Sequence, residues 1–406
     1  MIVLKTVIRI FTAVVFSALC VIFSLVALGS AIVPNNITAF SLGEIVFDDI
    51  YTININPRDT VDYQGDMRVS EVDAQVRLFG IIPVKNATVN QQEERQVIVS
   101  GECFGIKLYT DGVIVVGTRD VDTAQGKVNP AHDAGLEKGD IIISINDEKM
   151  LSSNQVEEAF NTNNADAYKV VIKRNGNYKT LSLKPVYSPS EGKYKVGVWV
   201  RDSTAGIGTL TFYNPENSSF AALGHPVNDV DTNDVMPFLS GEAVEATVTK
   251  LYKSKDGEAG SLCCDFSDNP IGMLTLNSDN GIYGTYINSP DESKAYYVAA
   301  SQEAERGHAQ ILCTVDDNPP AFYNVEITRI SYNSASGKNI VVKVTDEALL
   351  EKTGGIVQGM SGSPIIQNGR LVGALTHVVV DNPAKGYGIF AETMLEESYE
   401  VVADSE

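Results

Sequence analysis

One serine in the C-terminal third of the chain lies where a nucleophile could work. Ser361 belongs to the run GMSGSP (359–364), and residues 365–377 after it read as two apolar strands joined by a tight turn. In such a turn the backbone N–H groups of Ser361 and Gly359 can point together at a developing oxyanion. Glycine at 359 and 362 permits backbone conformations that a side chain would hinder. The pattern therefore predicts Ser361 as nucleophile, with Gly359 and Ser361 as oxyanion donors.

A nucleophilic serine needs a base, and the chain has only four histidines: His132, His225, His308 and His377. His225 ends the apolar run FAALGHP (220–226), where a barrel would present an imidazole to a cleft. It also precedes the serine in chain order, so His225 is the predicted base. His377, at the end of the second strand after the serine, is the alternative base. Its other interpretation is a role in packing. The remaining two histidines are expected on the surface.

The acid that would orient the base is not decided by spacing. Asp346 lies shortly before the serine, while Asp229, Asp231 and Asp234 crowd His225. His225 with Asp229 could also supply two ligands of a metal hydrolase. No H-E-x-x-H run supports that alternative, so we predict no metal and no cofactor.

The elements that must position these residues are short β-rich runs separated by Gly, Asn, Asp and Pro over residues 195–397. This pattern predicts an antiparallel barrel or sandwich. The serine turn resembles the G-D-S-G-G-P turn of chymotrypsin-like proteases, with Met360 and Ser363 in place of Asp and Gly. A strand follows it, which excludes the strand-to-helix elbow of α/β-hydrolases. We therefore expect a mainly β fold with some α, and a chymotrypsin-like β-barrel peptidase domain over residues 195–400.

A second unit is expected at residues 103–187, in which a strand (112–117) precedes a helix from Asn154 to Phe160. The run AGLEKGDII (134–142) resembles the bacterial, protease-associated kind of PDZ domain. That resemblance implies that a peptide adds as a strand to a sheet edge. The carboxylate-binding loop of that family would fall near Gly105 and Ile106. A PDZ-shaped spacer without a ligand is the alternative.

The N-terminus carries an uncharged apolar run at residues 10–33, preceded by Lys5 and Arg9. Roughly 20 apolar residues suffice to cross a bilayer, and the basic flank stays in the cytoplasm. We predict a transmembrane anchor with the bulk of the chain exported, and a cleaved signal is the alternative. Residues 34–102 are expected to form a linker and a small β region.

The composition of the chain limits the remaining classes of protein function. The net charge of −21 excludes a nucleic-acid binder, which would need basic patches to neutralise phosphates. The cysteine spacing fits neither a zinc pattern nor a disulfide framework. Buried thiols are therefore expected, and the spacing does not decide whether one disulfide joins two of the last four cysteines. The five cysteines are Cys20, Cys103, Cys263, Cys264 and Cys313.

Two long runs, 198–232 and 354–390, resemble the stage IV sporulation protein B family, the PDZ-containing serine peptidases of endospore formers. The resemblance implies an endopeptidase in the space between forespore and mother-cell membranes. It also implies that the enzyme processes itself and cleaves a membrane-associated regulator of an intramembrane protease.

Carried onto this chain, the family's nucleophile, base and acid match Ser361, His225 and Asp346. An acid so shortly before the serine departs from the chymotrypsin layout, which leaves its role open. The PDZ module could also bind a segment of its own chain. A catalytically silent PDZ adaptor tethered at the membrane is the alternative function.

Overall fold

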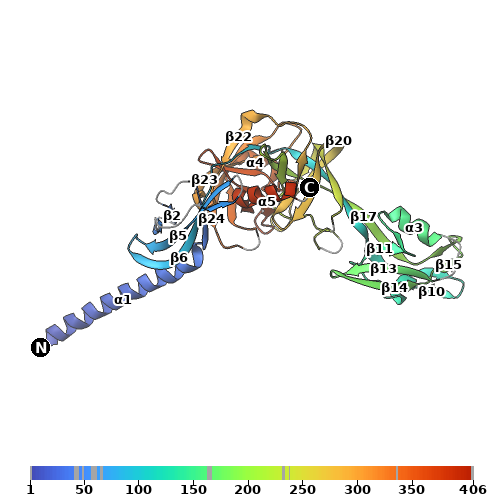
Figure 1. Ribbon diagram of the computed structural model, residues 1–406, viewed down its shortest axis with the longest axis horizontal. Coiled ribbons are helices and arrows are strands. Elements are labelled where there is room, and N and C mark those ends of the chain that lie inside the picture. Colours follow the sequence, from blue (N-terminus) through green and yellow to red (C-terminus); the bar gives the residue numbers. More distant parts are fainter. Residues whose placement is uncertain are drawn as a thin grey trace.

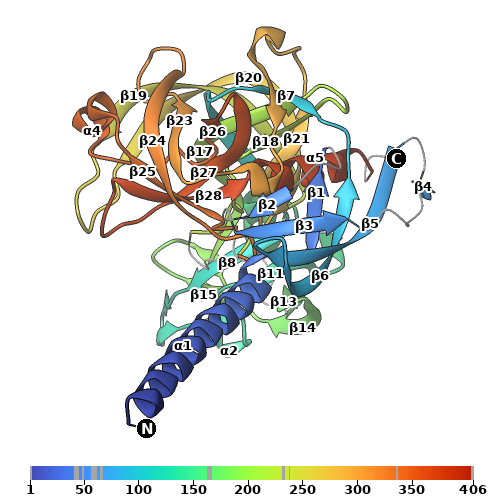
Figure 2. The same ribbon diagram turned by 90° about the vertical axis from the view of Figure 1, so that its left-hand side faces the viewer.

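The computed structural model describes residues 2–40, 45–47, 50–55, 62–64, 67–161, 167–230, 234–236, 238–334 and 337–403. A long helix projects from one end of a large β body, and a smaller β unit projects from the other end (Figure 1). Between the helix and the large body lies a small N-terminal sheet, which the second view places directly beside the helix (Figure 2). The C-terminal end of the chain lies at the large body.

The first helix, α1 (Ile2–Ile32), is apolar on all sides. Its span Leu4–Ile32 has a mean hydropathy of 2.6, and large side chains such as Phe11 and Phe23 are exposed around it. A 29-residue helix is about 43 Å long, which exceeds the roughly 30 Å of a bilayer core. The helix is therefore long and apolar enough to cross a membrane, as an anchor or as a signal sequence.

The N-terminal sheet has the strand order β1-β6-β5-β3-β2, with β4 paired to β5. Its apolar face buries Phe47, Tyr51 and Val76 in a core of its own. Tyr51 also holds the helix, because its hydroxyl donates a 2.8 Å hydrogen bond to the Leu25 carbonyl. The strands are β1 (Asn36–Ala39), β2 (Ile45–Phe47), β3 (Tyr51–Ile55), β4 (Asp62–Gln64), β5 (Met67–Leu78) and β6 (Ile82–Gln91).

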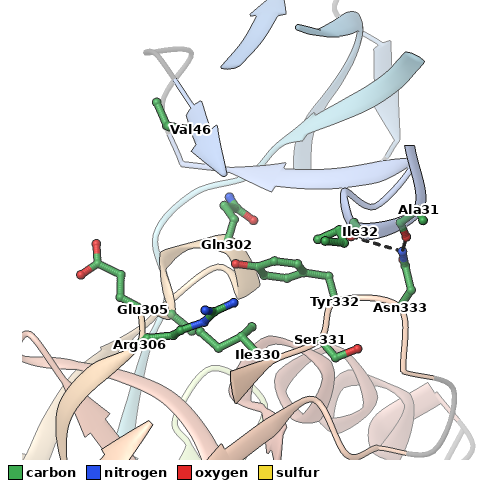
Figure 3. Close-up of a pocket in the computed structure, with 11 residues that line it drawn as sticks. Ala31, Ile32, Val46, Gln302, Glu305, Arg306, Ile330, Ser331, Tyr332 and Asn333 are labelled. Carbon is green, nitrogen blue, oxygen red and sulfur yellow. Dashed lines mark hydrogen bonds between the residues drawn. The ribbon is translucent and has the colours of Figure 1, made fainter. Parts of the chain in front are cut away.

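The junction between α1 and the large body contains a cavity of about 560 Å³ (Figure 3). Tyr332 lines this cavity. Its ring lies edge-on to the Phe47 ring, with centroids 5.2 Å apart, and stacks on the Phe390 ring, with centroids 5.9 Å apart. Next to it, the Asn333 Nδ2 donates to the carbonyls of Ala31 (2.7 Å) and Ile32 (3.2 Å). These bonds satisfy carbonyls at the end of the helix that would otherwise lack partners. The end of α1 is thereby bound to the domain that carries Ser361.

The smaller projecting unit packs two short helices against a twisted sheet, with its own core around Val113, Ile142 and Phe160. The turn of the AGLEKGD run is held by Asp140, which is fully buried and accepts two hydrogen bonds from Arg174 (2.5 and 2.7 Å). The elements are β9 (Val121–Thr123), β10 (Gly126–Val128), α2 (Pro130–Asp133), β11 (Ile141–Ile145), β12 (Glu148–Lys149), α3 (Ser153–Asn161), β13 (Tyr168–Arg174), β14 (Asn177–Leu183), β15 (Val186–Ser188) and β16 (Lys193–Lys195).

The large body is a closed β-barrel with helix α5 packed along β18, β21 and β27. Its elements are β7 (Gln96–Val99), β8 (Cys103–Thr118), β17 (Val198–Asn214), β18 (Ser219–Ala222), β19 (Ser240–Tyr252), β20 (Ser261–Ser278), β21 (Gly281–Tyr286), η1 (Glu292–Lys294), β22 (Ala295–Val298), η2 (Ser301–Glu303), β23 (Gly307–Cys313), β24 (Ala321–Ile330), β25 (Ile340–Val344), α4 (Glu347–Thr353), β26 (Pro364–Gln367), β27 (Arg370–Val378), β28 (Lys385–Phe390) and α5 (Ala391–Ala403).

Two long strands connect the barrel to the smaller unit. β8 and β17 run antiparallel through both bodies, from Thr118↔Val198 in the smaller unit to Cys103↔Thr209 in the barrel. Residues 96–110, expected in the linker and at the start of the PDZ-like module, thus pair with barrel strands. The predicted fold class, mainly β with an N-terminal apolar helix and a C-terminal barrel, is confirmed.

Candidate active site

The turn that carries Ser361 connects helix α4 and the strand pair β26–β27. Gly359 and Gly362 have φ of +102° and +97°, conformations that favour glycine. At position 362 a Cβ would also lie 1.9 Å from the Thr209 carbonyl oxygen. Strand β17 can therefore approach the turn at that point only because residue 362 has no side chain.

Two backbone donors of this turn have no partner in the part of the chain that the structure describes. The N–H groups of Met360, Gly362 and Ser363 donate to the carbonyls of neighbouring residues, at 2.7 to 3.2 Å. Those of Gly359 and Ser361 donate to no described acceptor. These are the two donors predicted from the sequence. Such a pair can stabilise the oxyanion of a tetrahedral intermediate.

Strand β17 fixes the turn from behind through two buried threonines. The Thr209 N–H donates to the Ser361 carbonyl (2.7 Å), and its hydroxyl donates to the Gly359 carbonyl (2.8 Å). The Thr211 hydroxyl donates to the Gly362 carbonyl (2.7 Å). These bonds hold the peptide units around Ser361 in one orientation.

His225 follows β18 through a turn in which Leu223 and Gly224 have φ of +66° and +70°. A Cβ on Gly224 would lie 2.8 Å from the Thr376 side chain, so this turn packs against the end of β27. The His225 Nδ1 lies 2.8 Å from the Pro226 carbonyl oxygen. Because a carbonyl can only accept, Nδ1 carries the proton and Nε2 is left as the basic nitrogen.

Burial lowers the pKa of His225 below its usual value, because a charged imidazole is poorly solvated there. The side chain is therefore neutral at neutral pH, which is the form that a general base requires.

His377, the alternative base, lies against His225. The two ring centroids are 4.6 Å apart, with the planes tilted by 36°. Burial of the ring, together with the charges of His225 and Lys338, lowers the pKa of His377 to about 4. The structure thus brings both candidate bases to the same place, next to Thr376.

The Ser361 hydroxyl donates to the Thr376 carbonyl at 2.5 Å. Among the described residues, no hydrogen bond joins Ser361 to either imidazole. Ser361 therefore has a hydroxyl rotamer in which the backbone, and neither imidazole, accepts its proton. Catalytic hydrogen bonds are often unformed until substrate binds.

Asp346 is not brought to His225. It is the N-cap of α4, where its Oδ1 accepts from the Leu349 N–H (3.1 Å) and its Oδ2 accepts from the Asn324 N–H (3.2 Å). Within the described chain no hydrogen bond or ion pair joins Asp346 to His225. In the described chain the Pro226 carbonyl is the partner of the His225 Nδ1, and the role of Asp346 as the acid stays a prediction.

The other candidate acids follow His225 in the chain. Asp229 is buried and forms an ion pair with Arg201 at 3.2 Å, while the Asp234 carbonyl accepts from the Asp229 N–H. Asp231 lies outside the described residues. No group of three or more His, Cys, Asp or Glu side chains that could hold a metal ion occurs in the described residues.

Gly105 and Ile106, the expected peptide-binding loop, lie instead in the barrel part of β8. Gly105 pairs with Ile207 on one side and with Val244 on the other. A strand paired on both sides has no free N–H groups to receive a carboxylate. A peptide-binding role for these two residues stays a prediction, and this placement does not favour it.

Sequence reasoning missed Thr209, Thr211 and the carbonyls of Pro226 and Thr376. Their roles depend on contacts between distant segments, and backbone carbonyls leave no mark in a sequence. Asp346 did carry a signal, because an Asp directly before an apolar helical run is a typical N-cap.

Comparison with known proteins decides the family. The sequence profile of the SpoIVB peptidase S55 family matches residues 192–395, half of the chain. The chain belongs to this family. It is accordingly a serine peptidase, and a PDZ domain profile matches residues 104–184. No curated protein matches the S55 peptidase chain.

Three solved structures resemble parts of this S55 peptidase. The PDZ domain of an SdrC-like protein from Listeria monocytogenes is 23% identical, with a TM-score of 0.18, over 22% of this chain and 87% of that one. The active form of the Rv3671c protease from M. tuberculosis is 13% identical, with a TM-score of 0.30, over 49% and 74%. The HtrA-type protease AlgW is 10% identical, with a TM-score of 0.31, over 54% and 62%.

Proposed function

We propose that the chain is a membrane-tethered, exported serine endopeptidase of sporulation, in which Ser361 is the nucleophile and His225 the base. The observation that carries this proposal is that the N–H groups of Gly359 and Ser361 donate to no described acceptor, in the turn that also presents the nucleophile. A partly buried imidazole in the adjoining turn, whose Nε2 has no described partner, supports it.

The reaction follows from these positions. When substrate enters, Ser361 rotates about χ1, so that its hydroxyl leaves the Thr376 carbonyl and donates to the His225 Nε2. The oxygen attacks the scissile carbonyl while Nε2 takes the proton, and the N–H groups of Gly359 and Ser361 bind the oxyanion. The imidazolium then gives its proton to the leaving amine, and water releases the acyl group by the same steps.

Asp346 is the acid implied by the family resemblance. Because the Pro226 carbonyl already accepts the single Nδ1 proton, an acid role would require that bond to break. We therefore assign the orientation of the imidazole to Pro226 and treat Asp346 as a helix cap.

The substrates that we propose are a segment of the chain itself and a membrane-associated regulator of an intramembrane protease. The apolar helix supports a site of action at the outer surface of the membrane that it crosses, in the space between forespore and mother cell. Asn333, which binds the end of α1 to the catalytic domain, supports cleavage close to the membrane, as does Tyr332, which packs on Phe47 of the N-terminal sheet.

We propose that peptides bind in the groove between α3 and the first residues of β17. This groove of about 290 Å³ is lined by apolar side chains, among them Val156, Phe160 and Val198. Residues 198–200 of β17 pair with β8, which is the strand whose register with them is defined in the described chain. An extended peptide could add along these residues of β17 and place side chains in the groove.

The central test is labelling of Ser361 by a fluorophosphonate probe, on the full chain in detergent. Wild type should be labelled at Ser361, and Ser361→Ala should lose the label while its thermal unfolding is unchanged. Incubation of the wild type should give new N-termini that Ser361→Ala does not give. Labelling at Ser363 in place of Ser361 would show that the nucleophile is misassigned.

A catalytically silent PDZ adaptor is favoured by one observation, the bond from the Ser361 hydroxyl to the Thr376 carbonyl. If that bond persists, neither labelling nor self-cleavage will occur in wild type, while the PDZ-like unit will still bind peptides. Labelling of the wild type excludes this alternative.

A further inference from the structure

Two thiols lie beside the catalytic turn and have no part in the chemistry above. Cys103 begins β8 and is buried, and Cys264, in β20, is half-buried. Their sulfur atoms are 3.2 Å apart, although 161 residues separate them in the chain. A disulfide needs an S–S distance of about 2.05 Å, so a shift of little more than 1 Å would bring the sulfurs to bonding distance.

The surroundings give the two sulfurs different roles. The contact with Cys264, together with burial, raises the pKa of Cys103. The same contact lowers the pKa of Cys264, while either sulfur can donate the hydrogen bond between them. Cys264 is thus both the more accessible sulfur and the better thiolate, which are the properties of an attacking thiol.

The other cysteines of the barrel do not offer this arrangement. Cys263 is the neighbour of Cys264 on the same strand, and successive side chains of a strand point to opposite faces. Cys313 is fully buried, its pKa is raised to about 12 by that burial, and it contacts Ser363. A selective pair is therefore present among the described cysteines.

We propose that Cys103 and Cys264 form a disulfide by thiol–disulfide exchange outside the cytoplasm. The oxidant is a disulfide, carried either by a small molecule or by an oxidised dithiol protein. The Cys264 thiolate attacks one sulfur of this oxidant, so that a mixed disulfide forms and the first thiolate leaves. Cys103 then loses its proton, and its sulfur attacks the Cys264 sulfur. The mixed bond breaks, and the second thiol leaves with that proton. Two thiols are oxidised, and one disulfide is reduced to two thiols.

The position of the bond would tie together two supports of the catalytic turn. Cys103 pairs with Thr209, which holds the carbonyls of Gly359 and Ser361. Two residues before Cys264, the Leu262 N–H donates to the Gln358 carbonyl at 2.9 Å. A Cβ on Gly359 would lie only 3.1 Å from the Leu262 side chain. The cross-link would therefore join β8 and β20 where they contact the turn.

The test uses the full chain with Ser361→Ala, so that its outcome does not depend on peptidase activity. The reduced protein is equilibrated with oxidised glutathione, denatured, and its thiols are counted and mapped by mass spectrometry. We expect the number of thiols to fall from five to three, with a cross-link between Cys103 and Cys264. The midpoint of thermal unfolding should rise by roughly 5 °C or more.

The matched control is Cys263→Ser, which should form the same cross-link at the same rate. Cys264→Ser should keep all its four thiols. If it does not fold, Cys103→Ala replaces it and should give only a mixed disulfide on Cys264. Five thiols remaining after oxidation, a stable mixed disulfide on the parent chain, or a cross-link through Cys263 would overturn the proposal.

Discussion

The hydroxyl of Thr209 offers the sharpest test of how the catalytic turn is held. It is fully buried and donates to the Gly359 carbonyl at 2.8 Å, in the peptide unit that lies between the two oxyanion donors. Thr209→Val keeps the shape of the side chain and removes only this bond. A buried carbonyl left without its donor costs about 1–3 kcal/mol, so the free energy of unfolding should fall by that amount.

The effect on catalysis follows from the same bond. Loss of a complete oxyanion donor lowers kcat about 10²–10³-fold, which sets the upper limit. A turn that is loosened but retains both donors should show a smaller decrease in kcat. A loss of about 1.4 kcal/mol of transition-state stabilisation corresponds to a tenfold slower reaction. We therefore expect Thr209→Val to react with a fluorophosphonate about tenfold more slowly than wild type.

Thr211→Val is the matched control. Thr211 has the same side chain, is equally buried, and donates to the Gly362 carbonyl, which lies beyond the nucleophile. It should lose similar stability in urea unfolding, while its labelling rate changes less than about threefold. If Thr209→Val reacts as fast as wild type, or if both variants slow equally, then the orientation of the Gly359 peptide unit does not control the oxyanion site.

Three further predictions concern the histidines and the acid. His225→Ala should lower the labelling rate of Ser361 by about 10³-fold or more, whereas His377→Ala should lower it less than tenfold; the reverse order would make His377 the base. Because burial lowers the pKa of His225, its neutral form persists as the pH falls. The acid limb of the labelling rate should therefore lie below pH 6.5, and a limb at pH 7 or above would contradict this. Asp346→Asn keeps the cap and should leave both activity and stability nearly unchanged, while Asp346→Ala should cost about 1 kcal/mol of stability. A severe loss of activity in Asp346→Asn alone would restore Asp346 as the acid.

The parts of the site that are local in sequence could be predicted from it. The turn around Ser361 and the strand pair after it are specified by glycines and by the dipeptide Asn368-Gly369, whose φ values of +51° and +76° suit a two-residue hairpin turn. The position of His225 likewise follows from an apolar strand that ends at a turn.

What could not be predicted depends on pairing between distant strands. Thr209 contacts Gly359 across 150 residues, and nothing in either segment specifies that register. The Gly105 region resembles the carboxylate-binding loop of PDZ domains, whereas the alternating run around it fits a strand that two neighbours cover, and β8 is paired on both sides there.

The register of β8 and β17 has a consequence for how the chain could be divided. Tyr109 pairs with Ser203 in the barrel, so the chain leaves the barrel and returns to it at adjacent positions. In terms of protein engineering, the whole PDZ-like unit is an insert at the open end of a β-hairpin. A two-residue Asn-Gly turn between Tyr109 and Ser203 should close that hairpin without moving Thr209. The S55 peptidase barrel would then be a minimal scaffold into which other recognition modules could be placed.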